Sequence, residues 1–225
     1  MSRRVLTLLA AVAALALRPA AVSGVDTDPA HQLASALQRK YDAVRDFTAD
    51  FIHTYEGGVL RKKVSERGHV VVKKPGRMRW TYTDPEDKVF VSDGVRLYSY
   101  LPADRQVYVA RVPPEDQATT PALFLTGKGN LLRDFDVSAA EPPEAAVGGT
   151  AALKLVPRAK ERDYDSLLLV VDRRSLELRM LVSEDRQGGR STFAFSELRE
   201  NTGVKDREFE FRIPRGVEVI TASAP

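Results

Sequence analysis

The chain has 225 residues, with 34 Lys and Arg against 31 Asp and Glu, and it contains no cysteine. This length suffices for one domain with a substantial core, and the lack of cysteine excludes disulfides, thiolate metal sites and a lipidated N-terminal cysteine. Arg3, Arg4 and Arg18 lie in a segment that we expect to be removed. Without them basic and acidic residues balance at 31 each, so the basic pI is little reason to expect a nucleic-acid partner.

The first 23 residues have the pattern of a secretory signal peptide. A basic start precedes an apolar run from Val5 to Leu17, and Ala21 and Ser23 form a small-x-small cleavage site. The apolar run is short for a membrane span, so a retained anchor is the less favoured alternative. We expect cleavage after Ser23, with Gly24 as the other position considered, and a single exported domain over 24–225.

Residues 25–45 predict an amphipathic helix. Asp28 suits the N-cap, and Pro29 suits the first helical position. Apolar residues recur at the spacing of one buried stripe. These residues are Leu33, Leu37, Tyr41 and Val44. We therefore expect this helix to lie with its apolar stripe on a sheet.

The stretch from His69 to Val109 predicts four short strands joined by turns. Apolar and polar residues alternate between Met78 and Tyr82, which puts the only tryptophan, Trp80, on an apolar face. Pro, Gly, Asp and Ser stop the strands for backbone reasons. They do so at Lys74–Gly76, Asp84–Asp87, Ser92–Gly94 and Pro102–Asp104.

Strands are also predicted over most of the remaining chain. The candidates are Phe47–Tyr55, Val59–Val72, Leu131–Val137, Leu153–Leu155, Leu167–Val171, Leu176–Val182, Thr192–Leu198, Glu208–Ile213 and Val217–Ile220. Thr120–Gly127 carries the start and stop signals of a short and unusually apolar helix. Residues 139–151 are rich in Pro, Gly and Ala and predict a mobile surface loop within the domain.

About ten strands with short links and two or three short helices predict a mainly β (α+β) fold. Sequential strands with short links form an antiparallel sheet, and this number of strands makes it strongly curved or a partial barrel. We expect the small helices to lie on its concave face.

No catalytic or metal-binding motif is evident in the sequence. The three histidines lack metal-ligand spacing, and there is no GxSxG elbow, P-loop or GxGxxG. No nucleophile–base pair can be named, so we expect no enzyme, no metal and no cofactor. Tyrosines with polar tips are common where an apolar pocket meets water. Candidates for such positions are Tyr82, Tyr98, Tyr100 and Tyr108.

Two short motifs are the most distinctive in the chain: P-G-R-M-R-W at 75–80 and S-D-G at 92–94. Further segments belong to the same pattern. They are Asp46–Phe51, Leu97–Tyr100, Gln106–Val107, Pro121–Leu125, Phe209–Phe211, Pro214 and Gly216–Val217. Together they make roughly residues 28–220 resemble the periplasmic outer-membrane lipoprotein carrier family, LolA.

The resemblance implies an unclosed antiparallel half-barrel with short helices as a lid over a hydrophobic cavity. The expected lining residues are Met78, Trp80, Tyr82, Phe90, Tyr98 and Tyr100. The expected lid residues are Leu123, Phe124 and Leu125. The family has an arginine before the proline that holds the lid shut; Lys74 stands there in this chain, and Arg77 and Arg79 are further latch candidates.

The resemblance also implies a function and partners. The protein would carry the acyl chains of lipoproteins from the inner to the outer membrane through the periplasm. It would receive them from an inner-membrane ABC-type transporter, pass them to an outer-membrane receptor, and act as a monomer. The alternative is a sensor or regulatory module of the same architecture that binds lipid or a partner protein.

Overall fold

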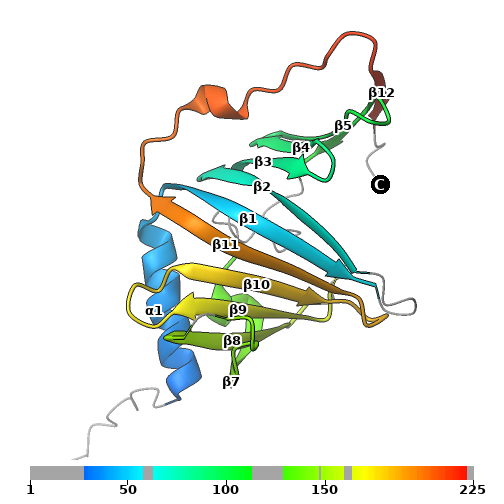
Figure 1. Ribbon diagram of the computed structural model, residues 1–225. Helices are drawn as coiled ribbons and strands as arrows, with labels where there is room; N and C mark the ends of the chain where they lie inside the picture. The colour runs from blue at the N-terminus through cyan, green and yellow to red at the C-terminus, as the bar shows by residue number, and fades with distance from the viewer. Residues whose placement is uncertain (1–27, 58–62, 113–128, 147, 160–163, 222–225) are drawn as a thin grey trace, which may run out of the picture.

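The computed structural model in Figure 1 describes residues 28–57, 63–112, 129–146, 148–159 and 164–221. The expected signal peptide, and the expected short helix with Leu123, Phe124 and Leu125, lie outside the described residues. Within the described residues, the helices are all too short or too polar to cross a bilayer.

The described residues form twelve strands in one sheet, where about ten were expected. They are β1 (Asp46–Glu56), β2 (Lys63–Lys73), β3 (Arg77–Asp84), β4 (Lys88–Asp93), β5 (Arg96–Leu101), β6 (Gln106–Arg111), β7 (Phe135–Ala140), β8 (Thr150–Pro157), β9 (Ser166–Asp172), β10 (Leu178–Glu184), β11 (Arg190–Glu200) and β12 (Glu218–Thr221). The four short strands predicted between His69 and Val109 are β3 to β6, preceded by the end of β2.

The strand order explains how the chain builds the sheet. It runs β12-β6-β5-β4-β3-β2-β1-β11-β10-β9-β8-β7. From β1 the chain adds strands outward to β6, then starts again at the far edge with β7 and works inward until β11 pairs with β1. The sheet curves strongly, and β12 and β7 remain its two edges, so the expected mainly β, unclosed half-barrel is confirmed (Figure 1).

Helix α1 (Pro29–Ala43) lies over one face of the sheet, which we call the inner face. The Asp28 carboxylate caps it by accepting a hydrogen bond from the Ala30 N–H at 2.9 Å. Its buried residues Ala34 and Leu37 join a single core with Phe51 and Trp80 of the sheet. The predicted cap is therefore confirmed, and of the predicted stripe Leu37, Tyr41 and Val44 are buried, whereas Leu33 is half-buried. The opposite side of the sheet is called the outer face.

Residues 201–217, the C-terminal segment, cross the outer face rather than adding a strand where one was expected (Figure 1). The predicted strand Glu208–Ile213 is wrong: Asp206–Phe209 form the 3-10 helix η2, and the residues after it have no strand partner. The Asp46 carboxylate anchors the start of the segment, accepting hydrogen bonds from the backbone N–H groups of Thr202 at 2.7 Å and Gly203 at 3.1 Å.

Because this segment crosses the sheet before it pairs, β12 meets β6 in parallel. The purely antiparallel sheet expected from the sequence is corrected at this one pair. A second correction concerns Leu131–Val137, because Leu131–Asp134 form the short helix α3 before β7 begins. Asn130 starts this helix, since its side chain accepts hydrogen bonds from the N–H groups of Leu132 and Arg133.

Candidate functional site

Six aromatic rings gather on the inner face, and we call them the aromatic cluster. Its members are Phe51, Trp80, Tyr82, Phe90, Phe193 and Phe195. The ladder register puts them on one face, because Phe51 lies opposite Phe195 and Trp80 lies opposite Phe90. The Phe51 ring meets the rings of Trp80 and Tyr82 edge-on, at centroid distances of 5.0 and 4.8 Å. Such contacts are favourable beyond their buried area.

The aromatic cluster is buried at its centre and open at its rim. Phe51 and Trp80 are 2% and 5% exposed, whereas Phe90 and Phe193 are only half-buried. A half-buried ring beside a buried one offers apolar surface that a hydrocarbon chain can cover. The four expected lining residues Met78, Trp80, Tyr82 and Phe90 share this face.

A row of four polar side chains continues the aromatic cluster on the inner face; we call it the polar row. His53 stacks on Phe193 with centroids 4.1 Å apart and planes at 3°. Its Nε2 lies 2.8 Å from the Ser191 hydroxyl, and its Nδ1 lies 3.2 Å from the Glu66 carboxylate. Lys88 Nζ completes the row by donating to Glu66 at 2.5 Å. Each member thus has a partner within the row.

Burial and mutual contacts set the charges in the polar row. Desolvation lowers the pKa of His53 and outweighs the opposing pull of Glu66, with Lys88 adding to the lowering. Burial raises the pKa of Glu66, but hydrogen bonds from Lys88 and His53 outweigh it, so this pKa is lowered. At neutral pH the row therefore holds one anion, one cation and a neutral imidazole, with no net charge.

Acidification should destabilise the folded protein through His53. The unfolded chain binds a proton on this histidine near pH 6.5, but in the folded protein the pKa is lower, so stability falls as pH drops below about 6.5. Glu66 adds a loss at lower pH, since its folded pKa is also depressed. We expect His53→Gln to lose less stability than wild type between pH 7 and 5.5 in urea unfolding. Equal losses would contradict this assignment.

Tyr98 and Tyr100, two expected lining residues, lie on the outer face. Tyr98 pairs with Val91 and Tyr100 with Val89, both of which alternate with Phe90. Their rings contact Phe211 of the C-terminal segment at centroid distances of 5.3 and 5.9 Å. The prediction that they share one lining surface with Trp80 is therefore corrected.

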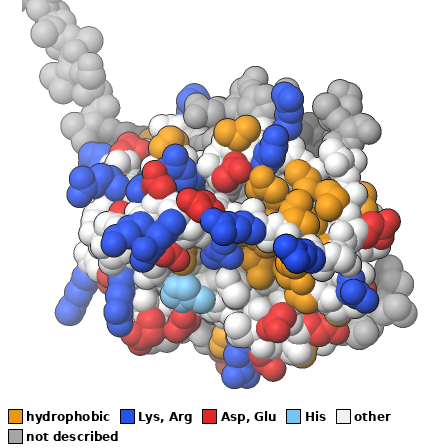
Figure 2. Space-filling view, turned by 90° about the horizontal axis from the view of Figure 1, so that it is seen from above, with side chains coloured by type: hydrophobic (Ala, Val, Ile, Leu, Met, Phe, Trp, Pro, Cys, Tyr) orange, Lys and Arg blue, Asp and Glu red, His pale blue; other side chains and the backbone are white. Residues whose placement is uncertain are grey.

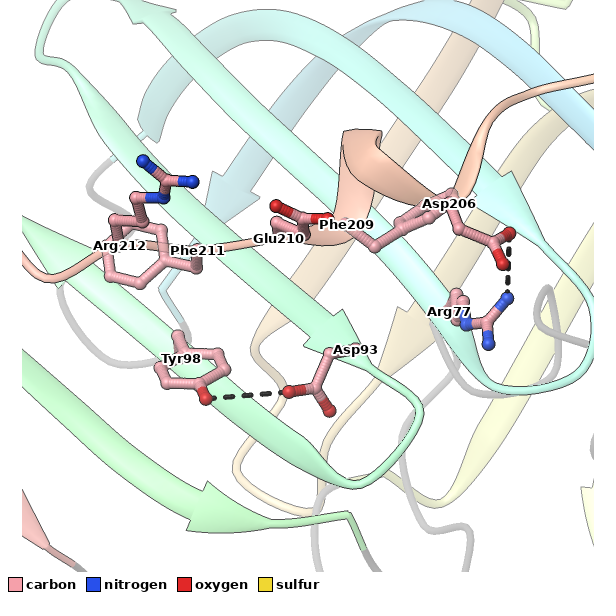
Figure 3. A pocket seen from close by; sticks show the side chains of 8 residues that line it. All are labelled: Arg77, Asp93, Tyr98, Asp206, Phe209, Glu210, Phe211 and Arg212. Atoms are coloured by element: carbon pink, nitrogen blue, oxygen red, sulfur yellow. Dashed lines mark hydrogen bonds and ion pairs between the residues drawn. The ribbon is translucent and has the colours of Figure 1, made fainter.

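An open pocket of about 410 Å³ lies between these strands and the C-terminal segment. Figure 3 shows the side chains that line it. It is lined by Arg77, Asp93, Tyr98, Asp206, Phe209, Glu210, Phe211 and Arg212. The Tyr98 hydroxyl lies 3.5 Å from the Asp93 carboxylate, and Arg77 pairs with Asp206 at 2.9 Å. Because the lining includes two guanidinium groups and three carboxylates, the pocket is unsuited to a purely hydrocarbon ligand.

The three latch candidates have partners away from the aromatic cluster. Arg79 donates to the carbonyl oxygens of Glu208 at 2.6 Å and Glu210 at 2.9 Å, and thus holds the C-terminal segment on the outer face. Lys74 Nζ donates to the carbonyl oxygen of Tyr41 at the end of α1 and lies over its ring. Burial lowers the pKa of Lys74. The expected lid itself lies outside the described residues, so the latch role remains a prediction.

Seen from the side that the C-terminal segment crosses, the molecule has hydrophobic side chains gathered on one part of the surface, with a row of Lys and Arg side chains beside them (Figure 2). Arg79 and Tyr98 contact the C-terminal segment on this face of the sheet. Two basic residues there have partners in the C-terminal segment: Arg77 pairs with Asp206, and Arg79 donates to the carbonyl oxygens of Glu208 and Glu210. They stabilise the crossing segment.

Sequence reasoning missed three parts of the site: Phe51 at its centre, the phenylalanines of β11, and the polar row. The sequence predicts Phe51 within a strand, but the residues that surround it come from strands far apart in the sequence. The available signal was the alternation in Thr192–Leu198, which sets Phe193 and Phe195 on one face. Groups of three or more His, Asp or Glu that could hold a metal are absent from the described part of the chain.

Comparison with known proteins shows what this chain is similar to. The family model described as outer membrane lipoprotein carrier protein LolA matches residues 42–212. The outer-membrane lipoprotein carrier protein of Chromohalobacter salexigens is 32% identical over 197 residues, covering 86% of this chain and 87% of that protein. The protein of the same name from Bordetella avium is 30% identical over 222 residues, covering 98% and 99%.

Among solved structures, an uncharacterized conserved protein from Thermus thermophilus has a similar fold. It is 14% identical, with a TM-score of 0.52 over 85% of this chain and 99% of that one. At this identity the similarity concerns the fold alone.

Proposed function

Because this chain belongs to the outer-membrane lipoprotein carrier family, LolA, we propose that it binds the acyl chains of lipoproteins on its inner face and carries them to the outer membrane. The observation that carries the proposal is the aromatic cluster, whose rim residues Phe90 and Phe193 are half-buried beside the buried Trp80. We further propose Met78, Trp80, Tyr82 and Phe90 as lining residues, and Leu123, Phe124 and Leu125 as the lid.

The energetics of hydrocarbon burial support reversible carriage. Each buried CH₂ contributes about 0.8 kcal/mol, so several fully buried acyl chains would exceed the roughly 18–21 kcal/mol at which non-covalent affinity saturates. A carrier has to release its load, so it must leave part of this surface exposed or covered only loosely. A rim of half-buried rings suits that requirement better than a closed pocket.

The proposal places the protein in the periplasm and gives it two partners. The export signal expected over residues 1–23 supports this location. The donor would be an inner-membrane ABC-type transporter and the acceptor an outer-membrane receptor, each handing over an acylated lipoprotein. A single domain over 24–225, acting as a monomer, would suffice for both exchanges.

Phe90→Glu should weaken binding of an acylated peptide at least tenfold, because a carboxylate at the rim has to be desolvated when hydrocarbon covers it. The matched control is Tyr100→Glu, which places the same charge on the next strand but on the outer face. Titration of a fluorescent acylated peptide, with circular dichroism to check folding, measures both. Equal loss in the two variants would reject the inner face as the binding surface.

We propose a carrier rather than an enzyme, although Ser191, His53 and Glu66 lie in the order of a nucleophile, base and orienting acid. Strand β11 is paired on both sides at Ser191, with Tyr55 and Ser183. Backbone N–H groups there serve the ladders, so they are poorly placed to stabilise an oxyanion. Turnover of a long-chain ester by the pure protein, lost in Ser191→Ala, would show that the polar row is catalytic.

The alternative function is that of a sensor that binds lipid or a partner protein to regulate a membrane process. Transfer distinguishes the two. A carrier moves an acylated peptide from donor to acceptor vesicles, whereas a sensor binds it and retains it while a partner's activity changes.

A further inference from the structure

The indole N–H of Trp80 has no hydrogen-bond acceptor. Among the described residues, its Nε1 is the one buried side-chain nitrogen or oxygen atom without a partner, and Trp80 is only 5% exposed. Buried donors are almost always paired, because an unpaired one has lost its bond to water and gained nothing in return. A donor left in this state calls for an acceptor from elsewhere.

The surroundings of Trp80 explain why the protein supplies none. Its neighbours are the carbon rings of Phe51, Phe193 and Phe195, with centroids 5.0, 5.2 and 6.3 Å away. On the adjacent strands it lies opposite Val70 and Phe90. None of these side chains has an acceptor.

The polar row adjoins Phe193 through His53, and its members are held in contacts with one another. His53 uses both ring nitrogens, one toward Ser191 and one toward Glu66. Glu66 uses one oxygen toward His53 and the other toward Lys88. These bonds hold the row where His53 stacks on Phe193, and none of its members accepts a hydrogen bond from the indole, so a ligand is the readier source of an acceptor.

The same surroundings define which acceptor fits. A carboxylate among these rings would be desolvated, and the one cation of the polar row, Lys88, is already paired with Glu66 at 2.5 Å. A neutral carbonyl attached to hydrocarbon carries a strong acceptor at a much lower desolvation cost. Ester- and amide-linked acyl chains have this group next to a chain that the aromatic cluster can cover.

We propose that Trp80 Nε1–H donates a hydrogen bond to the carbonyl oxygen of a bound acyl chain. The protein would then select ester- and amide-linked chains over alkyl chains of equal length that lack the carbonyl. This inference rests on the proposed binding of acyl chains to the inner face. It adds that one side chain recognises the ester or amide carbonyl, in addition to the contacts that the cluster makes with the hydrocarbon.

The test compares two lipids that differ only in the carbonyl: a diacylglycerol and the dialkyl ether of the same chain length. Each competes with a fluorescent acyl probe for the mature protein. One net hydrogen bond corresponds to a preference for the ester of roughly three- to tenfold. Trp80→Phe keeps an aromatic ring without the donor and should bind the two lipids equally. Phe90→Leu, the matched control, should weaken both and keep the preference.

A second measurement needs no variant. Trp80 is the only tryptophan in the chain, so its indole N–H gives a single signal in a ¹H–¹⁵N spectrum. The ester should move this signal downfield and slow its exchange with water, while the ether should do neither. If the wild type binds ester and ether equally and the signal responds alike to both, the inference is overturned and the carrier proposal stands. If neither lipid binds, both are overturned.

Discussion

Replacing Phe51 with alanine should cost about 3–5 kcal/mol of folding free energy, the largest effect we expect from a single side-chain truncation. This ring is 2% exposed and lies at the centre of the aromatic cluster, in edge-on contact with Trp80, Tyr82 and Phe193. Truncation removes its own burial and leaves a cavity between strands that come from both halves of the chain. The loss is a large share of the roughly 5–15 kcal/mol that stabilises a typical domain.

The matched control is Ile52→Ala, one residue along β1. Ile52 points to the other face and is 49% exposed, so its loss should stay within about 0.5 kcal/mol. Urea unfolding of the two variants, followed by circular dichroism, gives the difference directly. Similar losses would mean that the aromatic cluster does not form the centre of the fold.

Gly68→Ala should be the next most destabilising change, by about 1–3 kcal/mol or more. A Cβ at this position would lie 2.0 Å from the backbone oxygen of Thr81 and 2.8 Å from the Phe51 ring. Because one of these atoms belongs to the backbone of the adjacent strand, it cannot move aside as a flexible side chain would. Strands β2 and β3 would have to separate there, or Phe51 would have to leave the aromatic cluster.

Gly148→Ala is the control for this change, because a Cβ there meets no atom within 4 Å. It should leave the midpoint of thermal unfolding within about 2 °C of wild type, while Gly68→Ala lowers it by at least several degrees. If Gly68→Ala also unfolds at the wild-type temperature, the close approach of β2, β3 and Phe51 is not as the structure has it.

Local sequence patterns predicted the structure correctly where residues close in sequence determine it. Asp28 and Pro29 start α1 as predicted, because an N-cap and a first-turn proline act within one turn of helix. The alternation from Met78 to Tyr82 correctly put Trp80 on the buried face of β3, because successive side chains of a strand point to opposite sides.

Alternation along one strand did not predict which residues of two different strands share a face of the sheet. Tyr98 and Tyr100 form a regular apolar set along β5, but whether that set shares the face of Trp80 depends on the register with β4. One residue of register moves every side chain to the other face. In the structure Ser99 lies opposite Phe90, so the tyrosines face outward, against Phe211.

The strand predicted in the C-terminal segment, Glu208–Ile213, is wrong for a related reason. Phe209 and Phe211 alternate with charged residues as a strand would, but alternation requires only an extended chain with two different sides. To become a strand, the segment would also have to pair with an edge strand of the sheet. It lies across a face of the sheet instead. Asp46 and Arg79 hold it there through hydrogen bonds to its backbone, and its own residue Phe209 is buried.

The sequence by itself determined that this protein has an export signal pattern, one helix with a buried stripe, and strands enough for a curved sheet with an apolar inner side. These follow from periodicities and caps that act over a few residues. Only the tertiary structure decided which rings meet in the aromatic cluster, that His53, Glu66, Lys88 and Ser191 form one row, and that the indole N–H of Trp80 lacks an acceptor. Each of these depends on register between strands that are distant in the chain, and no local pattern encodes that register.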